Sequence, residues 1–181
     1  MKPKKNSAFT LVEMLAVIAI VGMLAGILLP AIGAVRSGAM VYRTRLQLHS
    51  IAVALGEWTA HYGFAPKFLA DGKPIAVNGA IGQFVQTLQG VDGDGGGGDL
   101  NPDNVRFYTF GGTDFDGDGR LVDAFGGSEI YAIGRPAGKL AIPPDNFPPS
   151  LRQVIPPNGV TAPFAVWSVR ARGGQAIGSW Q

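Results

Sequence analysis

The sequence predicts an α+β fold in which one long N-terminal helix, a membrane anchor continued by an amphipathic stem, packs on a small antiparallel sheet with extended loops. Three observations support this fold class. Residues 9–34 are apolar with a single charge, and residues 35–63 repeat apolar side chains at helical spacing. The remaining residues form short strand-like pieces separated by Gly and Pro. A chain of 181 residues suits one domain plus an anchor.

The anchor is the most informative segment. From Phe9 to Leu29 run 21 residues with one charge, Glu13. As a helix they would extend about 32 Å, enough to cross the hydrocarbon core of a bilayer. The apolar region of a secretory signal peptide is shorter, about 7–15 residues. A plain signal anchor gives Glu13 no purpose, although a carboxylate within hydrocarbon costs about 2.5–3.5 kcal/mol.

The stretch from Ala8 to Glu13 (AFTLVE), preceded by a short basic leader, resembles the processing site of type IV prepilins. The resemblance implies that a prepilin peptidase cuts between Ala8 and Phe9 and then N-methylates the new amino terminus. Glu13 stands at the fifth mature position, where the family carries an acid. Gly22 and Pro30 match two further family positions, whereas Ala8 replaces the usual Gly before the cut.

The resemblance also implies roles for these residues. Glu13 would pair with the amine of Phe9, most plausibly on a neighbouring subunit, because an unmatched buried charge costs about 3–5 kcal/mol. Gly22 and Pro30 are candidate helix breaks. Proline removes a helical hydrogen bond and favours a kink, but Pro30 could equally mark the membrane exit, and both interpretations stay open. The basic leader favours a cytoplasmic N-terminus.

Four segments follow from these patterns: a leader peptide (1–8), a transmembrane and assembly helix (9–34), an amphipathic stem helix (35–63) and an extracytoplasmic head (64–181). Gly63 and Pro66 should end the stem. Its apolar face is expected to be core, and it contains Val41, Leu48, Ile51, Leu55, Trp58 and Tyr62.

The head is expected to contain a short helix and several strands. Residues 79–88 predict the helix, and residues 105–110, 129–133 and 164–169 alternate or cluster in the manner of strands. The segment 142–163 holds seven prolines and predicts an extended covering loop.

An aspartate-rich loop, residues 92–123, is the chemical signal of the head. It holds eight of the thirteen acidic residues, and such crowding is repulsive unless water or a cation relieves it. The stretch 114–123 (DFDGDGRLVD) opens like a calcium loop. The expected ligands of a structural Ca²⁺ are the side chains of Asp114, Asp116, Asp118 and Asp123 and the carbonyl of Arg120.

This loop is not a full EF-hand, because Phe125 stands where the EF-hand places Glu. A solvated acidic turn is the alternative to a calcium site. Asp92, Asp94 and Asp99 lie among glycines and predict a flexible loop more than a second ion site. Residues 123–131 resemble a degenerate D-P-W-G-x-x-Y pattern of the major pseudopilins of type II secretion, in which the Asp helps to hold calcium.

The resemblance implies a structural subunit of a type II secretion pseudopilus, not an enzyme. Its partners would be other pseudopilins in a homopolymer, the prepilin peptidase and an inner-membrane assembly platform, with the head in the periplasm. The alternatives are a type IV pilus subunit and a membrane-anchored, calcium-dependent binding module. No Gly-x-Ser-x-Gly, His-Glu-x-x-His or phosphate-binding loop supports a hydrolase.

Charge and cysteine content exclude other classes. Without residues 1–8, the chain has twelve basic and thirteen acidic residues, and the basic residues form no stripe in the sequence. Nucleic-acid binding therefore has no support. The absence of Cys excludes disulfides, thiolate metal sites and Cys nucleophiles.

Overall fold

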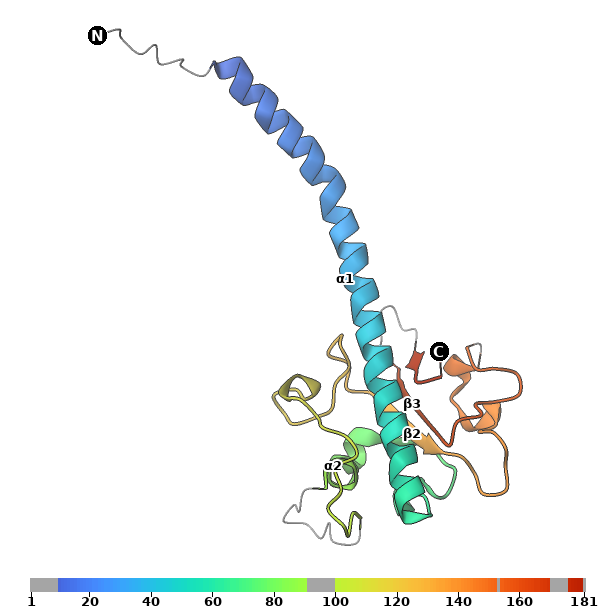
Figure 1. The fold of residues 1–181 in the computed structure, drawn as a ribbon. Coiled ribbons are helices and arrows are strands. Elements are labelled where there is room, and N and C mark those ends of the chain that lie inside the picture. Colours follow the sequence, from blue (N-terminus) through green and yellow to red (C-terminus); the bar gives the residue numbers. More distant parts are fainter. Residues whose placement is uncertain (1–9, 91–99, 153, 170–175, 181) are drawn as a thin grey trace. The chain divides into compact units, whose positions relative to one another are not determined.

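The computed structural model describes residues 10–90, 100–152, 154–169 and 176–180. Two helices and a four-stranded sheet make up its regular structure, together with short 3₁₀ turns (Figure 1). Helix α1 (Leu11–Tyr62) is an uninterrupted α-helix of 52 residues and passes through position 30. The chain divides into two compact units, residues 1–39 and residues 40–181. The α+β class with a long N-terminal helix and a small antiparallel sheet is confirmed.

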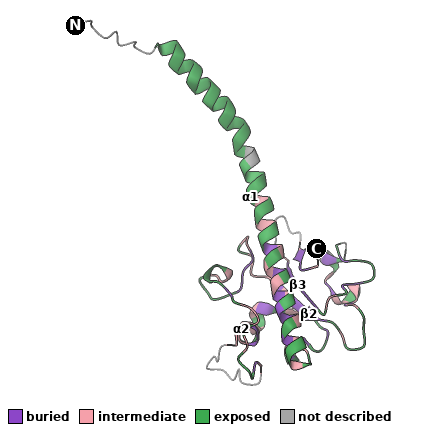
Figure 2. Cartoon of the chain, viewed as in Figure 1, coloured by how far each residue is buried: buried purple, intermediate pink, exposed green. Residues whose placement is uncertain are grey.

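The first unit contains the N-terminal part of α1. Its apolar side chains are exposed along residues 11–29 (Figure 2), with Leu11 80% and Met23 73% accessible. Within the described part of the chain this is the one helix long and apolar enough to cross a membrane. Because burying apolar surface is the main favourable contribution to folding, a helix that exposes so much of it requires an apolar environment.

The second unit begins with the C-terminal part of α1, which buries one stripe of side chains. Leu48, Ile51, Leu55 and Trp58 are at most 2% exposed and follow each other at steps of three and four residues. The helix ends at Tyr62 as predicted. Gly63 follows with a φ of +79°, and its N–H donates to the carbonyl of Thr59 at 2.8 Å.

The sheet of the second unit is antiparallel throughout, in the order β1-β2-β3-β4. Its strands are β1 (Ile75–Ala76), β2 (Ile130–Gly134), β3 (Phe164–Ser168) and β4 (Ile177–Gly178). The central pair sets Ala132 opposite Val166. The predicted strands at 129–133 and 164–169 are confirmed, whereas β1 and β4 have only two residues each and left no signal in the sequence.

Two hydrophobic cores flank this sheet. Side chains alternate across a strand, so Ile130 and Val166 join the core beneath α1, whereas Ile133 and Trp167 join a second core. All five residues of β3 are consequently buried. The second core is covered by the proline-rich segment, which contributes Ile142, Phe147, Leu151, Ile155 and Val160.

The proline-rich segment covers the sheet as predicted but is not simply extended. It contains two 3₁₀ turns, Pro144–Asn146 and Pro149–Leu151, each opened by a Pro-Pro pair. Proline pre-sets φ near −65°, which suits both the extended residue before each turn and the first position of the turn.

One predicted strand is wrong. Residues 105–110 form no strand, because their backbone is bound to a helix end instead. Helix α2 (Ile81–Gln89), which confirms the predicted helix at 79–88, ends next to this segment. The N–H groups of Phe107 and Tyr108 both donate to the carbonyl of Leu88 at 2.9 Å. The alternating side chains of this segment therefore serve core packing without a strand partner.

Candidate functional site

The first turn of α1 is closed by a reciprocal pair of residues. The N–H and the hydroxyl of Thr10 donate to Glu13 Oε2 at 2.8 and 2.7 Å, and the N–H of Glu13 donates to Thr10 Oγ1 at 3.3 Å. This is a capping box, in which residues at the N-cap and third helical positions satisfy N–H groups that the helix cannot. Within one chain the Glu13 carboxylate thus already has donors, supplied by Thr10.

Thr10 was missed as a functional residue, although the spacing T-x-x-E before an apolar helix is the signal that finds it. The predicted cleavage residues, Ala8 and Phe9, lie outside the described residues. Gly22 lies within α1, and a Cβ placed there would meet nothing within 4 Å. The proposed pairing of Glu13 with the Phe9 amine stays a prediction.

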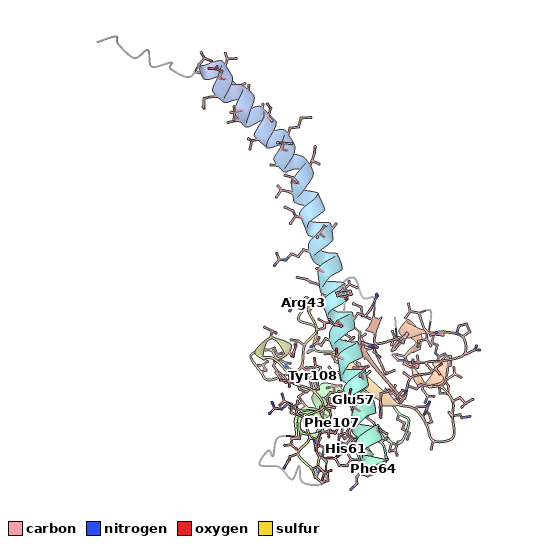
Figure 3. All side chains as sticks on the ribbon, viewed as in Figure 1. Arg43, Glu57, His61, Phe64, Phe107 and Tyr108 are labelled. Carbon is pink, nitrogen blue, oxygen red and sulfur yellow. The ribbon has the colours of Figure 1, made fainter. Side chains whose placement is uncertain are left out.

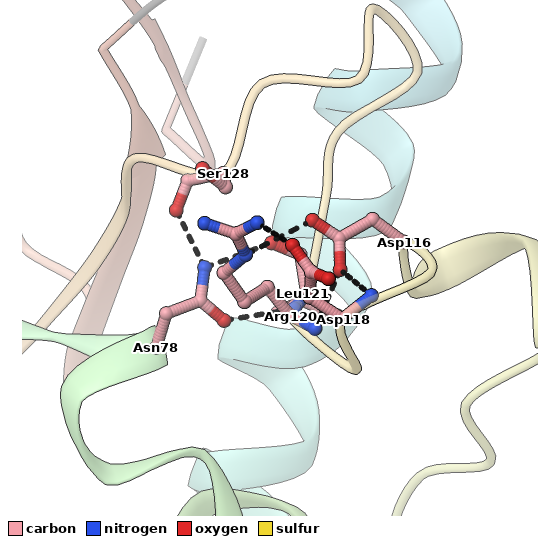
Figure 4. A network of polar contacts seen from close by, with 6 residues as sticks. All are labelled: Asn78, Asp116, Asp118, Arg120, Leu121 and Ser128. Carbon is pink, nitrogen blue, oxygen red and sulfur yellow. Dashed lines mark hydrogen bonds and ion pairs between the residues drawn. The ribbon is translucent and has the colours of Figure 1, made fainter.

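A second candidate site is the aspartate loop, of which residues 100–123 are described. Its tightest part is the turn from Asp116 to Arg120 (Figure 4). Asp116 Oδ1 accepts the N–H groups of Asp118 at 3.0 Å and Arg120 at 2.9 Å, and Arg120 Nε donates to Asp116 Oδ2 at 3.1 Å. The guanidinium of Arg120 also pairs with Asp118. Gly119 adopts the positive φ of +74° that this turn requires.

These hydrogen-bond donors lower the pKa of Asp116. The hydrogen bond from the Arg120 N–H, assisted by that of Asp118 and by the Arg120 charge, holds the pKa of Asp116 below its ordinary value. A carboxylate that accepts several N–H groups is favoured in its charged form. Asp116 is therefore already stabilised as an anion by the protein itself.

The aspartate loop is held to the rest of the head by Asn78 (Figure 4). Its amide group accepts the N–H of Leu121 at 2.8 Å and donates to the carbonyls of Leu121 at 2.9 Å and Ser128 at 2.5 Å. Asn78 lies in the 3₁₀ turn η2 (Val77–Ala80), 43 residues before Leu121. No local pattern in the sequence identified this residue.

Helix α1 holds the other side of the loop. Gln47 Nε2 donates to Asp114 Oδ1 at 3.2 Å and to the carbonyl of Val122 at 3.1 Å, and Thr44 Oγ1 accepts the N–H of Ala124 at 3.2 Å. The loop is thus fixed from α1 and from η2 together.

Asp123 is the buried member of the predicted ligand set, with 4% exposure. Its Oδ1 accepts the N–H groups of Phe125 at 2.9 Å and Gly127 at 2.8 Å, and its Oδ2 accepts the hydroxyl of buried Ser168 at 2.5 Å. A side chain at position 127 would collide with this carboxylate, since a Cβ there would lie 2.9 Å from Oδ2. Both oxygens of Asp123 therefore have protein donors.

The predicted calcium ligands are not gathered around one point in this arrangement. Asp116 and Asp118 face Arg120, Asp114 accepts the N–H of Gly111 at 2.7 Å, and Asp123 faces β3. Among the described residues no three His, Cys, Asp or Glu side chains are grouped as a metal site. The donor set as arranged does not fit a calcium ion, and calcium binding stays a prediction. Asp92, Asp94 and Asp99 lie outside the described residues.

Comparison with known proteins identifies the N-terminal segment. The prokaryotic N-terminal methylation motif matches residues 3–29. No curated protein and no solved structure matches the chain. Proteins with this motif are structural subunits rather than enzymes, and an apolar helix follows the leader here as it does in membrane-anchored pilin-like proteins. The chain therefore carries the signal of a type IV pilin-like prepilin, which implies processing by a prepilin peptidase and assembly into a pilin-like filament.

Proposed function

We propose that the chain is a structural subunit of a type II secretion pseudopilus. The observation that carries this proposal is the methylation motif over residues 3–29. The motif includes the apolar first part of the long helix α1, and a head with a small antiparallel sheet follows that helix. The leader would be removed before Phe9, the new amine methylated, and the subunits polymerised through their helices. Before assembly the chain would sit in the inner membrane with its N-terminus in the cytoplasm and its head in the periplasm.

Glu13 is the residue on which assembly should depend. Thr10 holds the Glu13 carboxylate close to the start of α1. Phe9, whose amine would be the new N-terminus after processing, immediately precedes Thr10 in the sequence. In an apolar filament core the carboxylate and an amine would neutralise each other, and losing one partner would leave an uncompensated charge. The Thr10 hydroxyl keeps the carboxylate oriented until a neighbouring amine reaches it.

The experiment separates processing from assembly. The full chain is produced together with a prepilin peptidase and its secretion machine, and the mature N-terminus is read by mass spectrometry. We expect a methylated Phe9 in the wild type and in Glu13→Gln, but filaments only in the wild type. Glu57→Gln is the matched control, because Glu57 is an exposed glutamate on the same helix. A chain that keeps residues 1–8 while forming filaments would overturn the proposal.

A pseudopilus subunit is favoured over a type IV pilus subunit by the resemblance of residues 123–131 to the major pseudopilins. Assembly with components of a type II secretion system but not with those of a type IV pilus would separate the two. The binding-module alternative would require an unprocessed monomer, which mass spectrometry of the N-terminus distinguishes from a processed subunit.

Structural calcium is a separate proposal, restricted to the stretch 114–123. Binding would require Arg120 to leave Asp116 and Asp118, so affinity should be weak, with a dissociation constant of about 10⁻⁴ to 10⁻³ M as in extracellular calcium modules. Calorimetry with millimolar Ca²⁺ tests it. We expect Arg120→Ala to tighten binding and Asp118→Asn to weaken it, and no heat in any of the three proteins would refute calcium binding.

A further inference from the structure

Two charges bound the apolar part of α1. Between Glu13 and Arg36 lie the 22 uncharged residues 14–35. As a helix these residues extend about 33 Å, which matches the hydrocarbon core of a bilayer at about 30 Å. A bilayer that surrounds this stretch therefore has Glu13 at one boundary and Arg36 at the other. Arg36 is the first charged residue beyond the span, on its C-terminal side.

The helix beyond this boundary is basic. From residue 14 to residue 56 the chain holds Arg36, Arg43 and Arg45 but no Asp or Glu. Of these, Arg36 and Arg43 are exposed, and they are seven positions apart, close to two helical turns. Figure 3 shows Arg43 on α1 and Glu57, the next acid of this helix, much further along it. No acid stands three or four residues from either arginine, where it could form an ion pair along the helix.

The described part of the chain also offers these arginines no ion pair from elsewhere in the fold. The salt bridges found there involve other basic residues, namely His61, Arg120 and Arg152. Asp114 lines a pocket of about 260 Å³ together with Arg43. No ion pair joins them, and the two oxygens of Asp114 accept N–H groups of Gln47 and Gly111 instead. The guanidinium groups of Arg36 and Arg43 are therefore available to an anionic partner.

The direction of helical side chains brings the charge of Arg43 closer to the bilayer. Position 43 lies about 10 Å beyond position 36 along the helix axis. Side chains of a helix lean toward its N-terminus, and a long Arg side chain carries its charge away from its own backbone. Tyr42, the neighbour of Arg43 in the sequence, is 65% exposed. Tyrosine is enriched at membrane–water interfaces because its ring is apolar and its hydroxyl is polar, so this segment suits the headgroup layer.

The same arginines oppose the orientation expected from the basic leader. Lys and Arg are normally in excess on the cytoplasmic side of a membrane span, whereas Arg36 and Arg43 would lie on the side of the head. Because they form no ion pair within the described residues, the compensating interaction has to come from another partner. Lipid phosphates are the anions nearest to a boundary residue, and each basic residue near an anionic membrane surface strengthens association about fivefold.

We propose that Arg36 and Arg43 bind the phosphate groups of anionic phospholipids in the leaflet that faces the head. The proposal rests on the membrane insertion proposed above and adds a lipid class to it. A guanidinium group suits this partner because it donates two parallel hydrogen bonds to one phosphate. Since a subunit leaves the bilayer when it joins a filament, the contact exists only before assembly and stabilises the membrane-inserted subunit.

Native mass spectrometry of the full chain tests this lipid preference. The chain is kept in detergent micelles with equal amounts of phosphatidylglycerol and phosphatidylcholine of the same acyl chains, and the bound lipids are counted. The leader lysines add the same background to every variant, so the measured quantity is the change in the ratio of bound phosphatidylglycerol to phosphatidylcholine. We expect Arg36→Gln/Arg43→Gln to lower this ratio about thirtyfold, and each single substitution to lower it about fivefold.

Arg106→Gln/Lys139→Gln is the matched control, because both residues are exposed cations of the head without an ion pair among the described residues. It removes the same charge and should leave the lipid ratio unchanged. Arg36→Lys/Arg43→Lys keeps the charge and should retain most of the preference. Equal ratios in the two double Gln variants would refute the proposal, and a loss in the double Lys variant as large as in its Gln counterpart would overturn the role of the charge.

Filament assembly gives an independent outcome. Lipid binding is measured on the single subunit, so it does not depend on whether the chain polymerises. If Arg36→Gln/Arg43→Gln keeps the lipid ratio but loses filaments, the arginines face an acidic protein surface and the lipid proposal is wrong. If the wild type prefers the anionic lipid but forms no filaments, the proposed function fails and the lipid site stands.

Discussion

Asp123 shows how a single buried carboxylate holds the head together. Its two oxygens accept the N–H groups of Phe125 and Gly127, just after the aspartate loop, and the hydroxyl of Ser168 on β3, which is fully buried. An acid of this kind is tolerated because each oxygen has a donor, whereas removing a donor leaves buried charge poorly solvated.

Ser168→Ala should therefore lower the free energy of unfolding by about 1–3 kcal/mol, the cost of a hydrogen bond to a charged group. Ser50→Ala is the matched control, since the Ser50 hydroxyl makes no hydrogen bond within the described residues, and it should change stability by less than about 0.5 kcal/mol. Urea unfolding of the full chain in detergent measures both. A Ser168→Ala protein as stable as the Ser50→Ala protein would contradict this role of Asp123.

The partners of the four predicted calcium ligands could not be predicted from the sequence. Alternate aspartates among glycines predict one metal centre, with Asp114, Asp116, Asp118 and Asp123 as its ligands. In the structure their acceptors are used by Gly111, Arg120 and Ser168. Ser168 is 45 residues from Asp123, and no local spacing reports a partner that distant.

At the scale of elements, the aspartate loop should give the head a stability that depends on pH. The N–H of Arg120, with that of Asp118 and the Arg120 charge, lowers the pKa of Asp116 below its ordinary 3.8. The folded state stabilises the Asp116 anion more than the unfolded state does. The contribution of Asp116 to the free energy of unfolding is therefore fully present above the ordinary pKa, and it is lost as the pH falls through the lower pKa of the folded state.

Asp116→Asn should flatten the dependence of stability on pH below about pH 4. Unfolding midpoints between neutral and strongly acidic pH measure this. Asp145→Asn is the control, because Asp145 has a side chain 89% exposed and only a long pairing with Arg152 at 3.9 Å. If both variants keep the acid sensitivity of the wild type, the loop is not the source of that sensitivity.

The proline-rich segment offers a second prediction at this scale. Gly159 has a φ of +82°, and a Cβ there would lie 2.3 Å from the carbonyl oxygen of Ile142. This carbonyl accepts the N–H of Val160 at 3.0 Å in the bridge that closes the segment. Gly138 has a similar φ of +73° but nothing within 4 Å of its Cβ position.

Gly138→Ala should cost about 1–2 kcal/mol, the penalty of a left-handed residue alone. Gly159→Ala should cost clearly more, because the carbonyl of Ile142 must also move. Thermal unfolding of the two variants in parallel gives the difference. Equal losses of stability in the two variants would show that the bridge between Ile142 and Val160 can shift without a measurable loss of stability.

At the scale of the whole molecule, the two units should be separable. Residues 40–181 contain both hydrophobic cores and the entire sheet, whereas the exposed apolar side chains of residues 11–29 need a bilayer or a filament core. We expect residues 40–181 to fold alone as a monomer in water, with a urea midpoint close to that of the full chain in detergent. Aggregation or loss of cooperative unfolding would contradict this division.

Patterns among neighbouring residues in the sequence determine many helices and strands of this protein by themselves. The methylation motif, the apolar anchor, the stem ending at Tyr62, α2, β2 and β3 all follow from composition and periodicity within a few turns or strands, because a helix or strand face is set by neighbouring side chains. The tertiary structure alone decided the rest. It pairs β1 with β2 and β4 with β3, and it leaves residues 105–110 without a strand partner. It also brings the hydrogen-bonding groups of Asn78, Gln47 and Ser168 to the aspartate loop. Hydrogen-bond partners of buried polar groups are chosen by proximity in space, and that proximity exists only once the chain has packed.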